Sequence, residues 1–169
     1  GGRSAAEHLI AHGRKDIAFL GDASDHYPEF RDRYLGARNA IFAAGLNISG
    51  DLQVDAFNTE QSGFDAAQQL INSSVRFDAI FAASDLIGIG AIRAIEAAGL
   101  TIPGDIAVIG FDDIPAASLA HPPLTTVQQD YRTAGEVLVD TLLKLIEGKS
   151  AESYTLPAKL VVRKSCGAH

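Results

Sequence analysis

Residues 78–113, DAIFAASDLIGIGAIRAIEAAGLTIPGDIAVIGFDD, decide the fold of this chain. The segment begins with an apolar run, 79–83, which has the length and composition of a strand buried on both faces. Apolar residues spaced by three and four then predict a helix that ends at Gly99. After a turn comes a second apolar run, 106–111. Strand, helix and strand at this spacing predict a βαβ unit with parallel strands and a right-handed crossover.

Both predicted strands end in polar residues. Ser84 and Asp85 follow the first strand, and Asp112 and Asp113 close the second. Because the two strands are parallel, these residues are expected at the same carboxyl edge of the sheet. Open parallel sheets bind ligands at that edge, so the sequence predicts a binding site there.

The rest of the chain continues the alternation. We expect further helices over residues 4–12, 30–44, 59–72 and 133–147, with Ser4 as the first N-cap, and further strands over 17–20, 52–57, 124–127 and 159–163. This order predicts a single α/β domain with a doubly wound, mostly parallel sheet. The strand at 52–57 is expected near a sheet edge, because Gln53 and Asp55 interrupt its apolar character.

Composition narrows the class of protein. A chain of 169 residues that is 47% hydrophobic can bury one core, and its net charge of -7 opposes a surface that tracks nucleic-acid phosphates. A single cysteine, Cys166, excludes an internal disulfide and a multi-cysteine metal site. We find no apolar run long enough to span a membrane and no signal-peptide pattern at the start of this sequence.

Catalytic and metal-binding patterns are weak, so we expect no enzyme activity, no metal and no cofactor. Asp112 and Asp113 are adjacent, so their side chains point in different directions, and neither has a His or Cys partner at a useful spacing. His8 and His12 share a helix face but lack a third ligand, and we expect them to be solvated.

Two glycines in the opening segment resemble the start of a dinucleotide-binding fingerprint. Gly88 and Gly90 lie inside the predicted helix instead of before it, and Arg93 occupies the third glycine position. We therefore interpret them as sites of close packing between the helix and the sheet.

Two further residues have both a structural and a functional interpretation. Arg33, at the start of the second helix, could bring a guanidinium to the carboxyl edge or form a surface salt bridge. Phe64 lies in an otherwise polar helix start and could be a core residue or a stacking wall for a ligand, with the core favoured by spacing alone.

Several segments together resemble a known family, the lactose-repressor/galactose-repressor (LacI/GalR) type transcription regulators. The matching segments are EHLIAHGRKDIAFLGD (7–22), RYLGA (33–37), FDAIFAASD (77–85), GAIRAIEAAGLTIPGDIAVIGFDD (90–113), PPLTTVQQD (122–130) and LPAKLVVRKSC (156–166). The chain resembles the carboxyl-terminal part of their effector-binding region, which has the periplasmic-binding-protein-like fold. The combination of GFDD with PLTTVQQD is the specific part of this resemblance.

The resemblance implies a cytoplasmic repressor that works as a homodimer or higher oligomer. Its small effector, a sugar or nucleoside, binds between two lobes and changes operator binding by an amino-terminal DNA-binding segment outside this sequence. The same resemblance implies that Arg33 and Asp112 contact the effector, that Phe64 is the aromatic wall, and that Ser84, Asp85 and Gln129 line the cleft. The alternatives are a periplasmic sugar-binding protein of a transporter and, less favoured, a small α/β enzyme.

The resemblance also concerns the helix at 130–150, which is expected to pack on the amino-terminal lobe or on a partner chain. Without such a partner its apolar stripe, which includes Val137, Leu138 and Leu142, would face water. Monomers rarely leave such a patch uncovered, so we expect this chain to self-associate or to swap the helix between copies.

Overall fold

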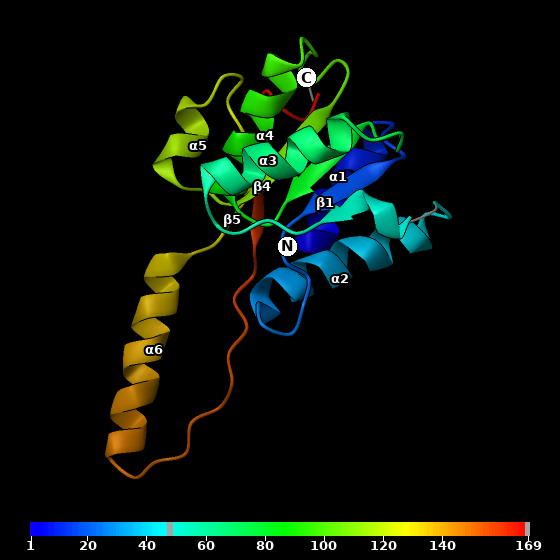
Figure 1. Cartoon of the computed structure of the whole chain (residues 1–169). Helices are drawn as coiled ribbons and strands as arrows, with labels where there is room; N and C mark the ends of the chain where they lie inside the picture. The colour runs from blue at the N-terminus through cyan, green and yellow to red at the C-terminus, as the bar shows by residue number, and fades with distance from the viewer. Residues whose placement is uncertain (47–48, 168–169) are drawn as a thin grey trace.

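The computed structural model describes residues 1–46 and 49–167 and confirms the α/β fold (Figure 1). Its sheet has the order β2-β1-β3-β4-β5-β6. The strands are β1 (Ile17–Leu20), β2 (Gln53–Val54), β3 (Ala79–Ala82), β4 (Ala107–Asp112), β5 (Thr125–Gln128) and β6 (Lys159–Val161). The first five are parallel and β6 runs antiparallel to β5. The edge position predicted for the 52–57 segment is confirmed, although its ladder is limited to the two residues of β2.

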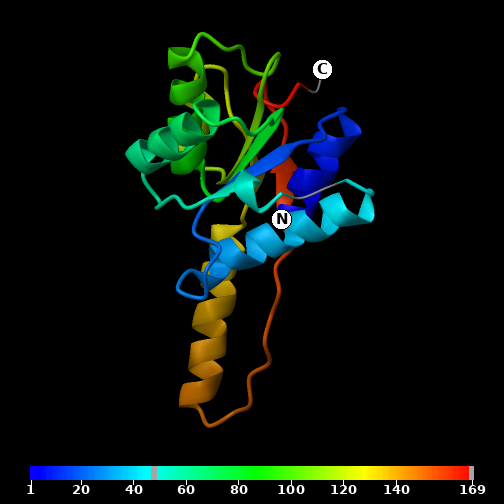
Figure 2. The same ribbon diagram turned by 45° about the vertical axis from the view of Figure 1, so that its right-hand side comes forward.

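Helices cover both faces of this sheet, as a doubly wound fold requires. They are α1 (Gly2–Ala11), α2 (Pro28–Ala43), α3 (Glu60–Ile71), α4 (Asp85–Ala97), α5 (Pro115–Leu119) and α6 (Tyr131–Ile146). Figure 2 shows α1 and α2 on one side of the sheet and α3 and α4 on the other. Residues of β1, β3 and β4 are buried on both faces, which explains why they form apolar runs without alternation.

The first helix begins earlier than predicted. It starts at Gly2, so Ser4 lies inside the helix and does not cap it. Gly2 packs closely on α2, because a Cβ atom on Gly2 would lie 2.0 Å from the carbonyl oxygen of Arg33.

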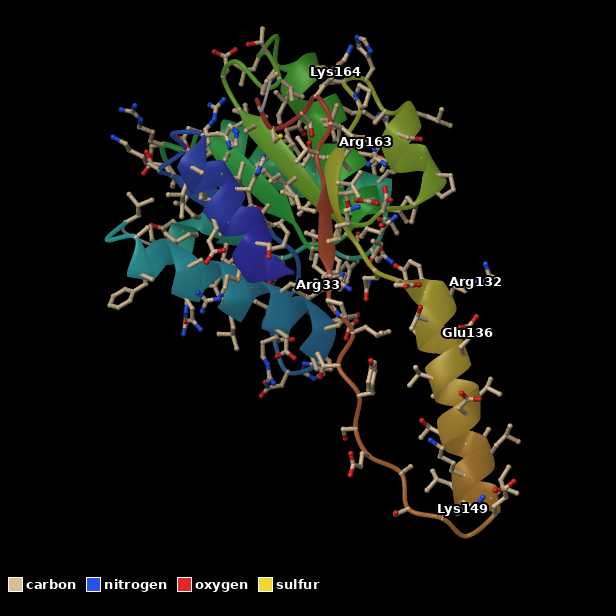
Figure 3. All side chains as sticks on the ribbon, turned by 180° about the vertical axis from the view of Figure 1, so that it is seen from behind. Arg33, Arg132, Glu136, Lys149, Arg163 and Lys164 are labelled. Carbon is tan, nitrogen blue, oxygen red and sulfur yellow. The ribbon has the colours of Figure 1, made fainter. Side chains whose placement is uncertain are left out.

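The last helix projects away from the rest of the molecule (Figures 1 and 2), and the view from behind in Figure 3 shows the same. None of its residues is buried, and Leu138, Leu142 and Ile146 are more than half exposed. The chain returns from its end through residues 147–158 to β6, which completes the sheet beside β5. Among the described residues, no helix has the length and hydropathy needed to cross a membrane.

Candidate functional site

The carboxyl ends of the parallel strands form one rim, as predicted. Asp22 follows β1, Phe57 follows β2, Ser84 follows β3, Asp112 ends β4 and Gln129 follows β5. Five separate segments thus bring polar and aromatic groups to one edge of the sheet. We call this edge the rim.

Arg33 and Asp112 form the centre of the rim. An Nη2 atom of Arg33 lies 3.3 Å from Oδ1 of Asp112, and both side chains are mostly buried. The other terminal nitrogen donates to the carbonyl oxygen of Ala83, and the guanidinium carbon lies 3.8 Å from the ring centre of Phe111. Burial lowers the pKa of Arg33, whereas the nearby carboxylate of Asp112 opposes this shift. The structure thus brings together two residues that are 79 positions apart in sequence.

The backbone at the end of β4 has an unusual conformation. Asp112 has a φ of 110° and Asp113 a φ of 58°, in the region that favours glycine. Such residues persist where their surroundings hold them, and they concentrate at functional sites. The turn directs the two carboxylates to different partners, because Asp113 pairs with Arg163 at 2.6 Å and accepts from Gln128. The adjacent acids therefore do not act as a pair.

Gln129 and Tyr131 complete the polar part of the rim. The Gln129 amide donates to Oδ1 of Asp112 at 2.6 Å and lies 3.3 Å from the Tyr131 hydroxyl. Burial, followed by the charge of Asp112, raises the pKa of Tyr131 to about 12. Sequence reasoning missed Tyr131, although its place two residues after Gln129 at the start of α6 could have indicated it.

The side chains of Ser84 and Asp85 are not exposed at the rim, and they bond to neighbouring groups of the protein. Both are buried, and Ser84 caps α4 by accepting from the backbone N–H of Ile87 at 3.4 Å. Asp85 accepts from the backbone N–H of Ile114 at 2.8 Å and from the Thr126 hydroxyl. Burial raises the pKa of Asp85 to about 6. The Ser84 hydroxyl thus caps α4, and the Asp85 carboxylate holds the β4–α5 turn that follows Asp112. That these residues line the cleft stays a prediction.

Phe64, which was predicted to be an aromatic wall, is partly buried against the core, and a more exposed ring lies at the rim. Phe64 lies at the contact of α3 with α4, where the Arg93 guanidinium is 5.9 Å from its ring and its backbone nitrogen approaches Gly90. Phe57 is instead 58% exposed at the rim. Helix packing turns Phe64 towards α4, whereas Phe57 lies in the segment between β2 and α3. Its position at the end of a predicted strand was the signal that could have identified it.

Phe57 belongs to a series of aromatic rings that leads to Arg33. Its ring meets Tyr27 edge-on at 6.2 Å between centres, and Tyr27 stacks with Phe30 at 6.0 Å. The Arg33 guanidinium lies 5.5 Å from the Phe30 ring. The rim therefore presents an apolar, aromatic side next to its polar centre. This combination is suited to a ligand with both hydroxyl groups and an apolar ring face.

His8 lies in α1, and His12 directly follows the last residue of this helix. Nε2 of His8 is 3.2 Å from Sγ of the buried Cys166, so His8 is less solvated than expected. The His8 and His12 rings are 4.3 Å apart, and burial lowers the pKa of His8. Within residues 1–46 and 49–167, no group of three side chains could hold a metal ion.

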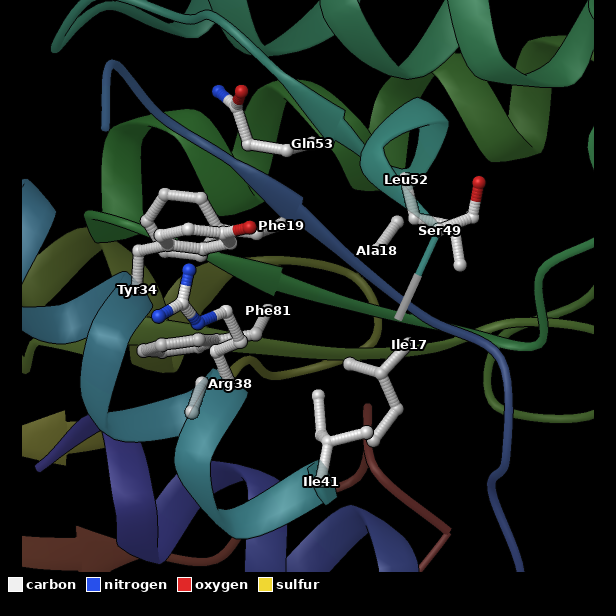
Figure 4. Close-up of a pocket in the computed structure, with 11 residues that line it drawn as sticks. Ile17, Ala18, Phe19, Tyr34, Arg38, Ile41, Ser49, Leu52, Gln53 and Phe81 are labelled. Carbon is white, nitrogen blue, oxygen red and sulfur yellow. The ribbon is translucent and has the colours of Figure 1, made fainter. Parts of the chain in front are cut away.

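A small hollow lies between α2 and the sheet, away from the rim (Figure 4). Phe19, Tyr34, Ile41 and Phe81 are among the residues that line it, and Arg38 lies at its side. Its free volume of about 10 Å³ leaves space for one water molecule at most. This hollow is a gap in the packing and cannot hold an effector.

Comparisons with known proteins give matches over most of the chain. A family model described as "Periplasmic binding protein-like domain" matches residues 6–166. The ribose operon repressor of Escherichia coli (strain K12) is 40% identical over 156 residues, which are 92% of this chain and 47% of that protein. The transcriptional regulator CelR of Thermobifida fusca is 36% identical over 167 residues, 98% of this chain and 49% of that protein. The chain spans about half the length of the curated relatives it matches.

Solved structures of similar proteins also match this chain over most of its length. A complex of the transcriptional regulator CelR with cellobiose superimposes with a TM-score of 0.92 at 35% identity, over 98% of this chain and 51% of that one. The lac repressor dimer bound to operator and the anti-inducer ONPF has a TM-score of 0.90 at 35% identity, over 98% of this chain and 57% of that one. Both similarities therefore extend over nearly the whole of this chain.

Proposed function

The chain belongs to the periplasmic binding protein-like domain family, in the form found in LacI-type transcriptional regulators, and from this we propose that it is the effector-sensing lobe of such a repressor. The observation that carries the proposal is the Arg33–Asp112 pair at the carboxyl rim of the sheet. A non-enzymatic role is part of the proposal. The relatives are named as transcriptional regulators, which favours a repressor over a sugar-binding protein of a transporter.

Each group at the rim has a role in this proposal. Arg33 and Gln129 both donate to Oδ1 of Asp112, so an effector hydroxyl that donates to this carboxylate would share it with them. Phe57 and Tyr27 offer aromatic surface for the apolar face of a sugar or nucleoside. Ser84 and Asp85 act indirectly by holding the turns that present these groups.

The rim also contacts α6, the helix that projects from the rest of the molecule. Among the described residues, the hydrogen bonds that join α6 to the body are concentrated at Tyr131, next to Gln129 and Asp112. An effector hydroxyl at Asp112 would compete with Gln129 and Tyr131 for this carboxylate. It would thereby change the contacts of the first residue of α6. Effector binding can then shift the population of lobe arrangements, provided that the effector binds one arrangement better than the other.

A ligand screen tests the proposal. We expect D-ribose, cellobiose or adenosine to raise the melting temperature of the chain and to shift the backbone amide NMR signals of Arg33, Asp112 and Gln129. The same compound should have little effect on Asp112→Asn, which removes the carboxylate charge. The proposal would be contradicted by a compound that stabilises the native chain and this variant equally.

The exposed face of α6 gives a second prediction. The relatives are about twice as long as this chain, and we infer that their additional amino-terminal sequence covers α6. The 169-residue chain by itself should therefore self-associate through Leu138, Leu142 and Ile146. Sedimentation velocity should show a dimer or larger species, and Leu138→Glu with Leu142→Glu should shift it towards the monomer.

The matched control for this prediction is a polar change on the same helix. Glu136→Gln leaves the apolar face of α6 intact and should leave the association unchanged. A strictly monomeric native chain, with α6 protected from amide hydrogen exchange, would contradict the prediction.

A further inference from the structure

The turn after β4 places two aspartates in a conformation that favours glycine. Asp112 and Asp113 both have a positive φ, and two such residues in succession persist only where neighbouring groups hold them. The conformation matters for the rim, because it separates the two side chains and leaves the Asp112 carboxylate beside Arg33. The groups that hold this turn therefore decide the geometry at the centre of the rim.

Asp85 and Thr126 hold the backbone of the turn. Asp85 accepts from the backbone N–H of Ile114, the residue after the two aspartates, at 2.8 Å. The Thr126 hydroxyl donates to Asp85 and accepts from the backbone N–H of Asp113 at 3.4 Å. These contacts fix the chain after Asp112, but they do not involve the side chain of Asp113.

Arg163 holds the side chain of Asp113. Its Nη2 atom lies 2.6 Å from Oδ1 of Asp113, and its Nη1 atom donates to the carbonyl oxygen of Leu124 at 2.8 Å. Gln128 donates to the second carboxylate oxygen, Oδ2, at 2.7 Å. The side chains of Arg163 and Asp113 are only 19% and 13% exposed, so water has little access to the pair. A charged pair that is shielded in this way and has further hydrogen bonds keeps its geometry better than an exposed one.

Arg163 reaches the centre of the rim only through this turn. Among the described residues, its side chain bonds to neither Asp112 nor Arg33, and Figure 3 shows Arg163 and Arg33 apart from each other. Arg163 follows β6, the strand through which the chain returns from α6. Asp112 is contacted by Gln129, which precedes α6, whereas Asp113 is contacted by Arg163. The two adjacent acids are thus tied to the two different segments that join α6 to the body.

From these contacts we infer that Arg163 is a positioning residue of the effector site, which fixes the turn through Asp113 so that Asp112 faces Arg33. The inference rests on the proposed effector-sensing function and adds a residue that acts through Asp113 instead of touching the effector. Without Arg163, the Asp113 carboxylate would lose its cationic partner in a mostly buried place. The turn would then rearrange, and Asp112 would no longer be held beside Arg33.

Arg163→Met tests the inference, because it keeps much of the length of the side chain and removes its donors. Isothermal calorimetry with D-ribose, cellobiose or adenosine, whichever binds in the screen, should show an affinity about tenfold below that of the native chain. Asp113→Asn removes the other charge of the pair and should have a similar effect. Because the two residues act as a unit, the variant with both changes should bind no more weakly than either single variant. Arg163→Lys keeps the positive charge and should restore part of the affinity.

A second measurement needs no ligand. The NMR signal of the Arg33 side-chain Nε–H reports whether Asp112 still faces this guanidinium. It should shift in Arg163→Met and in Asp113→Asn, although neither change is made at a residue that bonds to Arg33.

Arg14→Met is the matched control. Arg14 also joins distant segments, because its guanidinium donates to the backbone carbonyl oxygens of Asp78 and Pro103. It precedes β1 and Asp78 precedes β3, so these contacts lie at the opposite edge of the sheet from the rim. Arg14→Met should lower the melting temperature, as Arg163→Met does, and should change neither the affinity nor the Arg33 signal. A residue with a merely structural role would behave like Arg14.

The outcomes distinguish this inference from the proposed function. Native affinity in Arg163→Met, measured well below its melting temperature, overturns the inference and leaves effector sensing intact. An equal loss of affinity in Arg14→Met also overturns it, since general destabilisation would then explain the loss. If Arg163→Met does not fold, native affinity in Asp113→Asn overturns the inference instead. If none of the three compounds binds the native chain, the proposed function fails, and an unshifted Arg33 signal would separately show that Arg163 does not position Asp112.

Discussion

Arg33→Ala is expected to lower effector affinity about 100-fold, because it removes a fork of donors from the centre of the rim. It also leaves Asp112 without its cationic partner in a mostly buried place. Removing one member of a buried pair is costly in itself, and we expect the free energy of unfolding to fall by about 2–4 kcal/mol. Isothermal calorimetry with the compound that binds best in the screen, and urea unfolding, would measure the two effects.

Two further variants make this result specific. Arg38→Ala removes an arginine from the same helix, where it lies near Tyr34 and away from the rim, and should leave affinity unchanged. Arg33→Lys keeps the charge but cannot donate both to Asp112 and to the Ala83 carbonyl while stacking on Phe111, so it should behave more like alanine than like arginine. Full affinity in Arg33→Ala would remove Arg33 from the proposed site.

Gly90→Ala is expected to destabilise the fold by about 3 kcal/mol or more, although it adds a single methyl group. A Cβ atom at this position would lie 2.0 Å from the carbonyl oxygen of Glu60 and 2.7 Å from the backbone nitrogen of Phe64. These are backbone atoms of α3, so the two helices would have to move apart. Gly63 makes the reciprocal close contact, with its Cβ position 2.2 Å from the carbonyl oxygen of Ile87.

Gly135→Ala is the control for this prediction. It makes the same change in the interior of α6, where no atom outside the adjoining backbone of the helix and its two chain neighbours lies within 4 Å of the added group, and should stabilise that helix slightly. Urea unfolding of both variants would compare them directly. If Gly90→Ala unfolded at the same urea concentration as the native chain, the close crossing of α3 and α4 would not exist in solution.

Gly88 and Gly90 show what a sequence pattern can and cannot predict. Their interpretation as sites of close packing is confirmed for Gly88, whose Cβ position is 3.6 Å from Cα of Gly110 in the sheet. Gly90 packs on α3 instead of on the sheet. A pattern of small residues indicates that something approaches the helix closely, but the neighbour depends on how the layers assemble.

The strands and most of the helices could be predicted because their signals are local. Ile17–Leu20 is an uninterrupted apolar run, and Asn58 and Thr59 before a helical pattern predict a cap at one of the two, which in α3 is Thr59. The close contact of Gly2 with α2 could not be predicted in this way, because its contact residue Arg33 is 31 positions later in the chain.

The candidate site was predicted to the extent that strand ends determine it. Arg33, Asp112 and Gln129 are brought together because α2 begins at the rim and because β4 and β5 are neighbours that end there. The partial burial of Phe64 could not be predicted, since the helical pattern does not reveal which face α4 covers. Its contact with an effector stays a prediction. Ser84 and Asp85 lie at the expected edge, but their burial depends on the turn that folds over them.

The sequence by itself determined the order of strands and helices, the parallel sheet and the edge at which polar groups gather. These follow from runs of apolar residues, caps and turn residues that act over a few positions. The tertiary structure alone decided that Asp112 faces Arg33 while Asp113 faces Arg163, and that Phe57 is exposed at the rim. Those outcomes depend on side-chain directions set by contacts between distant segments, which compete for the same space and the same hydrogen-bonding partners.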